Sequence, residues 1–271
     1  MTTPPDEVAS LGEVCAETAR VVGQRVLAWR RERRELAAYF GSPTAYVLMG
    51  VYLVLSGYFF YSDVALFVTF GAQVLSTGLW RFVFVDYRLV TLLVLPLVTM
   101  RLFAEERKLG TIELVWTLPV KDYQVILGKF LAAWCFFLVI VLLAMIPFAV
   151  FYAFFPFDLG PPIAGFVGLI LLGTAFIACG IAASTLTENQ VVAAMLTYGV
   201  LVFFWFMTWN EAVGDESIIR VLLLLSLFDH YYNFASGSIQ TVDVAYFLVF
   251  AAFFLFIALR SLQSRSWRGV V

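Results

Sequence analysis

The chain has 271 residues, of which 62% are apolar and only 13% are charged, and its mean hydropathy is +0.93. This composition lies outside the range of soluble globular domains and indicates an integral membrane protein. The formal net charge of -2 identifies no partner, because in a membrane protein the distribution of charge between the two sides carries the information. We expect no nucleic-acid partner. The three cysteines have no paired spacing, so neither a disulfide framework nor a metal site is expected.

Residues 1–43 form a predicted cytoplasmic segment that contains a basic amphipathic helix. In "VVGQRVLAWRRERRELAAYF" apolar side chains recur at steps of three and four residues, and arginines fill the other faces. Such a helix lies along the inner membrane interface. A lipid anchor and a role in assembly are both open for it. Its candidate residues are Trp29, Arg30, Arg31, Arg33 and Arg34.

Charge-free runs predict most of the membrane-spanning helices. About 20 apolar residues are needed to cross the hydrocarbon core. Four runs without a charge reach this length, at residues 36–62, 130–157, 159–187 and 189–210. A shorter apolar block at 244–259 reaches spanning length with Val242 and with Arg260, whose long side chain extends to the interface.

Residues 63–104 hold two apolar blocks, 64–80 and 89–100, and the basic residues decide which one spans. If only the second does, from about 84 to 104, then 14 of the 17 basic residues lie in the cytoplasm. If both span, the basic loop and the C-terminal tail move outside, so we reject that model. The prediction is an all-α integral membrane protein with six transmembrane helices in 44–261 and both termini cytoplasmic, including a tail at 262–271. Residues 62–84 then form an external segment, interfacial or partly re-entrant.

The loop at 101–129 is predicted to be a structured cytoplasmic hairpin. Gly110 breaks the chain, Thr111 is a plausible N-cap, and Glu113 occupies the first turn of a short helix that ends at Pro119. This helix carries an apolar cluster that includes Leu118, and exposed apolar clusters usually pack against something. A solvated connection and a docking surface are the two interpretations.

Catalytic chemistry is not indicated by any motif. Gly128-Lys129 resembles the end of a phosphate-binding loop, but Phe130 replaces the required Ser or Thr and no nucleotide-binding motif remains. Glu105 and Glu106 suggest an intramembrane metalloprotease as an alternative. Such a protease pairs its glutamates with histidines on neighbouring helices, and the chain has a single histidine, His230, which argues against this alternative. We expect His230 at a surface or an interface. The four clean spans contain no ionisable residue, so no ion-coupling site is visible within them.

Several segments together resemble the ABC type-2 permeases, the membrane subunits of ATP-driven exporters. The first is "MRLFAEERKLGTIELVWTLPVKDYQVILGKFLAA", and the others are "YFGSPTAYVLMGVYLVLSGYFFY", "ASTLTENQVVAA" and "LSLFDHYYNF". The resemblance is closest to the gliding-motility (Gld) and copper-maturation (Nos) branch and covers most of residues 30–265. The N-terminal extension of about 20 residues and "WRFVFVDYRLV" depart from the family pattern.

The resemblance implies a function for the N-terminal helix and for the cytoplasmic loop. The basic helix would be an elbow helix, and the loop would hold a coupling helix that seats on a separate ATPase subunit. The implied coupling residues are Glu105, Glu106, Arg107, Gly110, Thr111, Glu113, Leu118 and Pro119. A second, smaller contact would be the turn of Thr187, Glu188, Asn189 and Gln190. The connection 211–241 would hold either a short re-entrant helix or an ordinary interfacial one.

As implied partners we expect a second permease copy, identical or related, and two ATPase subunits that bind ATP and Mg, while this chain itself binds no cofactor. The expected location is the bacterial cytoplasmic membrane. One alternative is a complex that transmits force or assembles an envelope structure with a membrane-anchored external protein. A membrane scaffold without dependence on ATP is a third class.

Overall fold

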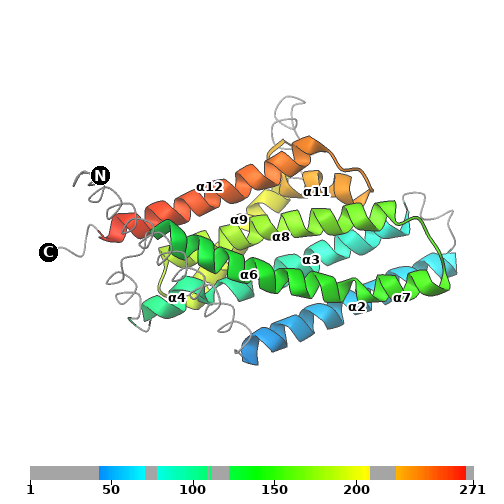
Figure 1. Cartoon of the computed structure of the whole chain (residues 1–271), viewed down its shortest axis with the longest axis horizontal. Coiled ribbons are helices and arrows are strands. Elements are labelled where there is room, and N and C mark those ends of the chain that lie inside the picture. Colours follow the sequence, from blue (N-terminus) through cyan, green and yellow to red (C-terminus); the bar gives the residue numbers. More distant parts are fainter. Residues whose placement is uncertain (1–42, 71–77, 109, 111–121, 208–223, 267–271) are drawn as a thin grey trace, which may run out of the picture.

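All regular elements in the described part of the chain are α-helices. The computed structural model describes residues 43–70, 78–108, 110, 122–207 and 224–266. The long helices lie side by side and run alternately in opposite directions (Figure 1). The predicted all-α class is confirmed for these residues. The helices are α2 (Pro43–Phe70), α3 (Leu79–Thr99), α4 (Arg101–Lys108), α6 (Asp122–Ala144), α7 (Ile146–Phe154), α8 (Gly160–Leu186), α9 (Gln190–Phe206), α11 (Leu227–Ala235) and α12 (Thr241–Ser266).

The two ends of the bundle are distinct. We name the end that holds α4 and the start of α6 the inner end, after the side that the basic residues predict, and the end that holds α11 the outer end. The first turn of α2 reaches the inner end, since Arg101 Nη1 donates to Thr44 Oγ1 at 2.8 Å. The last turns of α12 also reach the inner end, because Ser261 Oγ donates to the Thr185 carbonyl at 3.2 Å. The described chain therefore begins and ends on the same side (Figure 1).

Five of the described helical segments are long and apolar enough to cross a membrane. They are Pro43–Thr69, Leu79–Lys108, Asp122–Phe154, Gly160–Leu186 and Thr241–Ser264. The predicted span at 189–210 corresponds to α9, which has 17 residues. At about 1.5 Å per residue this helix is roughly 26 Å long, a little less than the hydrocarbon thickness of about 30 Å.

Helix α8 forms the centre of the bundle. In its most apolar window 78% of the residues are buried, against 22% for α2 and 28% for α12. Its glycines admit neighbouring side chains onto the backbone: a Cβ atom at Gly173 would lie 2.1 Å from the Phe137 ring of α6, and one at Gly180 would lie 2.0 Å from Thr99 Oγ1 of α3. Small residues that allow such close approach are typical of helix interfaces in membranes.

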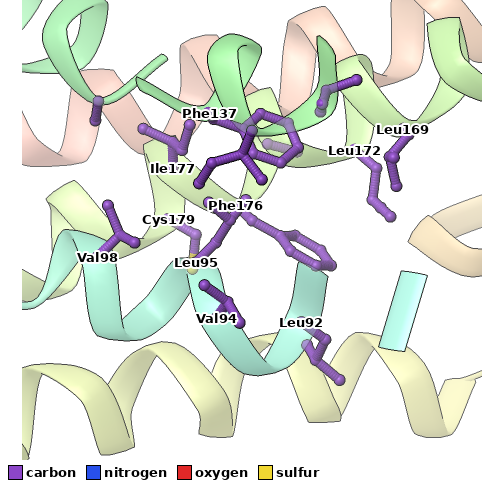
Figure 2. Packing of buried hydrophobic residues seen from close by; sticks show 14 of the residues in the cluster. Leu92, Val94, Leu95, Val98, Phe137, Leu169, Leu172, Phe176, Ile177 and Cys179 are labelled. Carbon is purple, nitrogen blue, oxygen red and sulfur yellow. The ribbon is translucent and has the colours of Figure 1, made fainter. Parts of the chain in front are cut away.

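The core around α8 is apolar. Figure 2 shows Phe176 of α8 between Phe137 of α6 and the aliphatic side chains of α3. These side chains are all fully or almost fully buried. Because lipid tails are as apolar as this core, close packing and not exclusion from water holds the helices together.

Helix α2 continues beyond the predicted end of the first span. The expected helix ended at residue 62, before Asp63, and 64–80 was predicted to be an external segment. The structure differs, since α2 extends through Asp63 to Phe70 and α3 begins at Leu79. One acidic residue does not end a helix when the apolar pattern resumes after it. Most of the predicted external segment belongs to α2, Gly78 and α3. The remaining residues, 71–77, lie outside the described residues.

Helix α3 also tolerates charges that the sequence pattern treats as a boundary. The guanidinium carbon of Arg81 lies 4.0 Å from the centre of the Tyr232 ring, and that of Arg88 lies 4.7 Å from the centre of the Phe228 ring. Aromatic faces stabilise such cations where water is scarce. Both rings belong to α11, which is far from α3 in sequence. The second span therefore begins at Leu79 and not near residue 84.

The described part of the external connection 211–241 packs into the bundle. Helix α11 carries six buried residues, and Tyr231 Oη donates to the Phe84 carbonyl of α3 at 2.9 Å. Burial raises the pKa of the Tyr231 hydroxyl well above its usual range, so the group stays a neutral donor. Helix α11 is therefore packed against the other helices at the outer end of the bundle.

Candidate functional site

The two arms of the predicted cytoplasmic loop are joined by an ion pair at the inner end. Lys129 Nζ of α6 lies 2.6 Å from Glu106 Oε1 of α4. The lysine side chain is only 3% exposed and the glutamate 30%. On the same face of α4, the Phe103 ring centre lies 5.0 Å from the lysine nitrogen. The ammonium is therefore held between a carboxylate and an aromatic face.

The first arm of the loop is also fixed to the central helix. Ser184 Oγ of α8 accepts hydrogen bonds from the Phe103 and Ala104 amides at 3.0 and 3.1 Å, and it donates to the Met100 carbonyl at 3.2 Å. The amides in the first turn of a helix have no partner within that helix. Ser184 thus caps α4 from a different helix, and the base of the loop is anchored to α8.

Replacing Ser184 with alanine is expected to lower the free energy of unfolding by about 2 kcal/mol, because two buried amides lose their acceptor. The effect is measured as the shift of the unfolding midpoint of the purified chain in detergent. Ser264→Ala is the matched control, since Ser264 is exposed and its hydroxyl donates only to the Ser261 carbonyl. Equal midpoints for the two variants would contradict the capping role.

The predicted coupling residues that lie in the described ranges occupy one short segment. Glu105 is exposed on α4, whereas Glu106 and Arg107 are partly buried. Gly110 is exposed and has a φ of 69°, a left-handed conformation that favours glycine, and its amide donates to the Arg107 carbonyl at 3.0 Å. The predicted break at Gly110 is confirmed. Four further coupling residues lie outside the described residues: Thr111, Glu113, Leu118 and Pro119. The predicted elbow residues Trp29, Arg30, Arg31, Arg33 and Arg34 also lie outside them.

The predicted second contact is a capped turn at the inner end. The Asn189 amide donates to Thr187 Oγ1 at 3.0 Å, and Asn189 Oδ1 accepts from the Val191 amide at 2.9 Å, which caps α9. Glu188 is exposed and Gln190 is partly buried. Helix α4 packs against both α8 and α9, the two helices that this turn connects. The structure therefore brings the turn and α4 to the same part of the surface.

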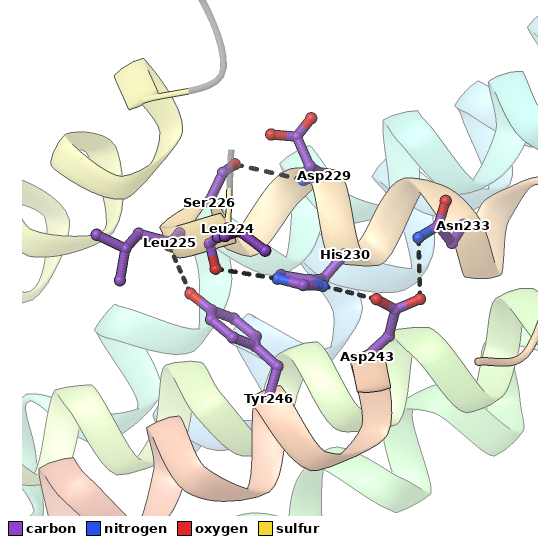
Figure 3. Close-up of polar contacts among 8 residues, drawn as sticks. All are labelled: Leu224, Leu225, Ser226, Asp229, His230, Asn233, Asp243 and Tyr246. Carbon is purple, nitrogen blue, oxygen red and sulfur yellow. Dashed lines mark hydrogen bonds and ion pairs between the residues drawn. The ribbon is translucent and has the colours of Figure 1, made fainter. Parts of the chain in front are cut away.

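A second polar cluster lies at the outer end (Figure 3). His230 Nδ1 of α11 lies 2.6 Å from Asp243 Oδ1 of α12, and Asn233 Nδ2 donates to the other carboxylate oxygen at 2.9 Å. The imidazole also stacks on the Tyr246 ring, with 4.1 Å between the ring centres. His230 is 9% exposed and lies between α11 and α12, so of the two expected positions, a surface or an interface, the surface position is excluded. These contacts fasten α11 to α12.

Sequence reasoning did not identify Ser184, Lys129 or Asp243 as partners in these networks. Each sits in a stretch whose pattern predicts only a helix, and its partner is distant in sequence. The sequence did contain one signal, an ionisable residue beside an apolar run. Burying such a residue costs free energy unless it has a partner. Lys129 and Asp243 are such groups.

Comparison with known proteins gives a family for most of the chain. A sequence model described as "ABC-2 family transporter protein" matches residues 81–260, about two thirds of the 271 residues. No match to a curated protein was found. The matched region runs from α3 to α12 and contains the anchored loop base and the turn beside it. The chain therefore belongs to the ABC-2 family of transporter membrane proteins.

Proposed function

We propose that this chain is the permease half of an ATP-driven exporter, coupled to a separate ATPase through the loop between α4 and α6. The observation that carries the proposal is the anchored base of that loop, in which Lys129 joins α6 to α4 and Ser184 joins α4 to α8. Family membership implies an ATPase partner. On the resemblance of its loop motif, we assign the chain to the gliding-motility and copper-maturation branch.

The anchored base supports a mechanical role for the loop. A force applied to residues 109–121 reaches α4 at Lys108 and α6 at Asp122. Because the ion pair connects these two helices, they move together and not independently. Because Ser184 holds α4, the movement continues into the central helix α8. A connected set of packed helices is the physical route by which such a displacement travels through a membrane domain.

The proposed assembly has two permease copies and two ATPase subunits in the bacterial cytoplasmic membrane. ATP and Mg are bound by the ATPase subunits. Closure of the ATPases on ATP displaces both coupling loops, and the helices behind them rearrange. Support for a closely apposed ATPase comes from exposed polar groups on α4 and on the turn beside it, where Glu105 and Glu188 face solvent.

Reversing the charge of Glu105 tests the proposed contact. We expect an ATPase subunit to co-purify with the tagged full chain from native membranes, and we expect Glu105→Arg to reduce its amount about tenfold. A like charge placed against a complementary surface costs more than the 1.4 kcal/mol that a tenfold loss requires. Glu105 is chosen because it is exposed, so its replacement leaves the buried ion pair intact.

The control is Asp158→Arg, at another exposed acid, which lies between α7 and α8 at the outer end. It is expected to retain the ATPase. If no ATPase accompanies the unaltered chain in mild detergent, the transporter proposal is wrong. If Glu105→Arg retains as much ATPase as Asp158→Arg, then α4 is not part of the contact.

A further inference from the structure

Asp63 is a carboxylic acid inside the first spanning helix. The expectation of clean spans without ionisable residues assumed a first helix that ends at residue 62, but α2 continues to Phe70. Asp63 is 8% exposed, and its Oδ2 atom is buried and has no hydrogen-bond partner among the described residues. A buried carboxylate without a partner is costly. Ionisable residues in membrane spans therefore mark functional sites by default.

A second buried polar group, the Tyr87 hydroxyl of α3, interacts electrostatically with Asp63. On the face of α2 that packs against α3, Tyr52 Oη donates to Thr91 Oγ1 at 3.1 Å, and Thr91 donates to the Tyr87 carbonyl at 2.7 Å. Asp63 follows Tyr52 by about three helical turns and so lies on the same face. The buried side chain of Tyr87 also interacts with Ser56 of α2. A carboxylate oxygen without a partner and a buried phenol thus share the interface between α2 and α3.

A cluster of aromatic rings begins one helical turn before Asp63. Phe60 lies about one turn before Asp63 on α2, and its ring centre is 4.7 Å from that of Phe148 in α7. The Phe148 ring is in turn 5.5 Å from Trp80 and 5.9 Å from Tyr87. Helices α2, α3 and α7 therefore each contribute a ring to this cluster. The faces of aromatic rings attract cations.

The basic residues of the region are directed elsewhere. Arg81 and Arg88 stack on rings of α11, as described above, and no salt bridge to Asp63 is present among the described residues. A second acid, the partly buried Asp86, interacts electrostatically with both Asp63 and Arg88. In the part of the chain that the structure describes, Asp63 therefore has no ion-pair partner.

We propose that Asp63 and the aromatic rings beside it bind the ammonium group of an organic cation. The carboxylate accepts the charged N–H groups, Tyr87 Oη supplies one further polar contact, and the rings cover the apolar body of the ligand. Asp86 adds a second negative charge at the edge of the site. If the chain is a permease, as proposed above, this site assigns its cargo to the class of amphipathic amines.

An inorganic cation fits these residues less well. Calcium takes six to eight oxygen ligands and magnesium demands six in near-octahedral geometry. The described residues at this position offer two carboxylates and one phenol, and no group of three acidic, cysteine or histidine side chains suited to a metal is found in the described chain. Aromatic walls supply no oxygen ligands, but they do suit an organic ammonium ion.

Equilibrium binding to the full chain in phosphatidylcholine nanodiscs tests the site without any ATPase. The probe is the fluorescent primary amine dansylcadaverine, and its N-acetyl derivative, which lacks the charge, is the ligand control. We expect the amine to bind and the acetylated compound to bind at least tenfold more weakly. We expect Asp63→Asn to weaken amine binding at least tenfold. Asp158→Asn, at an exposed acid on the same side of the membrane, is expected to bind as the unaltered chain does.

Addition of phosphatidylethanolamine to the nanodiscs distinguishes two sources of the ammonium group. Competition with the probe identifies a lipid headgroup as the natural ligand, whereas unchanged binding identifies an amine from solution. Equal affinity for the amine and its acetylated form, or for the unaltered chain and Asp63→Asn, would overturn the proposal. Displacement of the probe by Na⁺ but not by choline would also overturn it. A failed ATPase purification leaves this result untouched, so the two proposals can fail separately.

Discussion

Replacing Glu106 with alanine is expected to lower the free energy of unfolding by about 3 kcal/mol, because it removes a carboxylate that is ion-paired with the buried ammonium of Lys129. Lys129 is 3% exposed and cannot recover water without a movement of α4 or α6. The Phe103 ring remains beside it but compensates only a fraction of the lost ion pair. The loss is measured by SDS titration of the chain in mixed micelles, followed by tryptophan fluorescence.

Replacing the lysine of this ion pair is expected to lower the free energy of unfolding by less. Lys129→Met removes the charge but retains most of the volume, and the remaining Glu106 is 30% exposed and keeps part of its hydration. The double variant Glu106→Gln with Lys129→Met is expected to be more stable than Glu106→Ala alone, since no uncompensated charge stays buried. Equal losses for the two single changes would contradict the difference in burial. Rescue by the double variant separates the ion pair from any effect of either residue alone.

A methyl group at Gly180 is expected to destabilise the bundle by about 2 to 3 kcal/mol through overpacking. The added Cβ atom would lie 2.0 Å from Thr99 Oγ1 and 2.6 Å from Thr99 Cβ. Thr99 is a short side chain whose hydroxyl donates to the Leu95 carbonyl at 3.0 Å, so it cannot rotate away without losing that bond. Helices α3 and α8 must therefore separate. The unfolding midpoint of Gly180→Ala in detergent measures the effect.

Gly199→Ala is the matched control for this change. Gly199 lies in α9, and no atom is found within 4 Å of the position that its Cβ atom would occupy. Alanine is favoured over glycine inside a helix by roughly 0.5–1 kcal/mol, so this variant is expected to be slightly more stable than the unaltered chain. If both variants change stability by the same amount, helix propensity and not close packing of α3 on α8 governs the response.

Charge-free runs located most of the helices but misjudged their ends in one region. The runs at 159–187 and 189–210 match α8 and α9 closely at their inner ends. The pattern failed at 63–88, where α2 includes Asp63 and α3 includes Arg81 and Arg88. A span tolerates a charge when another part of the fold solvates it. For the two arginines that part is α11, more than a hundred residues further along the chain, and no local pattern reveals such a partner.

The candidate site was predictable as a segment but not as a set of contacts. The expected contact of Glu106 with an ATPase stays a prediction, and the structure adds an ion pair with Lys129 that the sequence did not indicate. Both residues flank the same loop, yet sequence spacing alone does not say that two helices approach each other at these turns. The capping role of Ser184 was even harder to predict from the sequence. A serine in an apolar helix usually bonds to its own backbone, and only the packed position of α4 turns this one into a cap.

The central position of α8 has a consequence for biosynthesis. Chains are made from the N-terminus, so α3 and α6 are present when α8 enters the membrane, while α11 and α12 are not. Until α12 arrives, the side of α8 that it covers faces lipid, and Gly168 stays open until Phe234 of α11 packs against it. Completion of the fold therefore waits for residues 241–266. A chain whose translation stops earlier exposes its own centre, which gives the membrane degradation machinery a physical basis for recognising it.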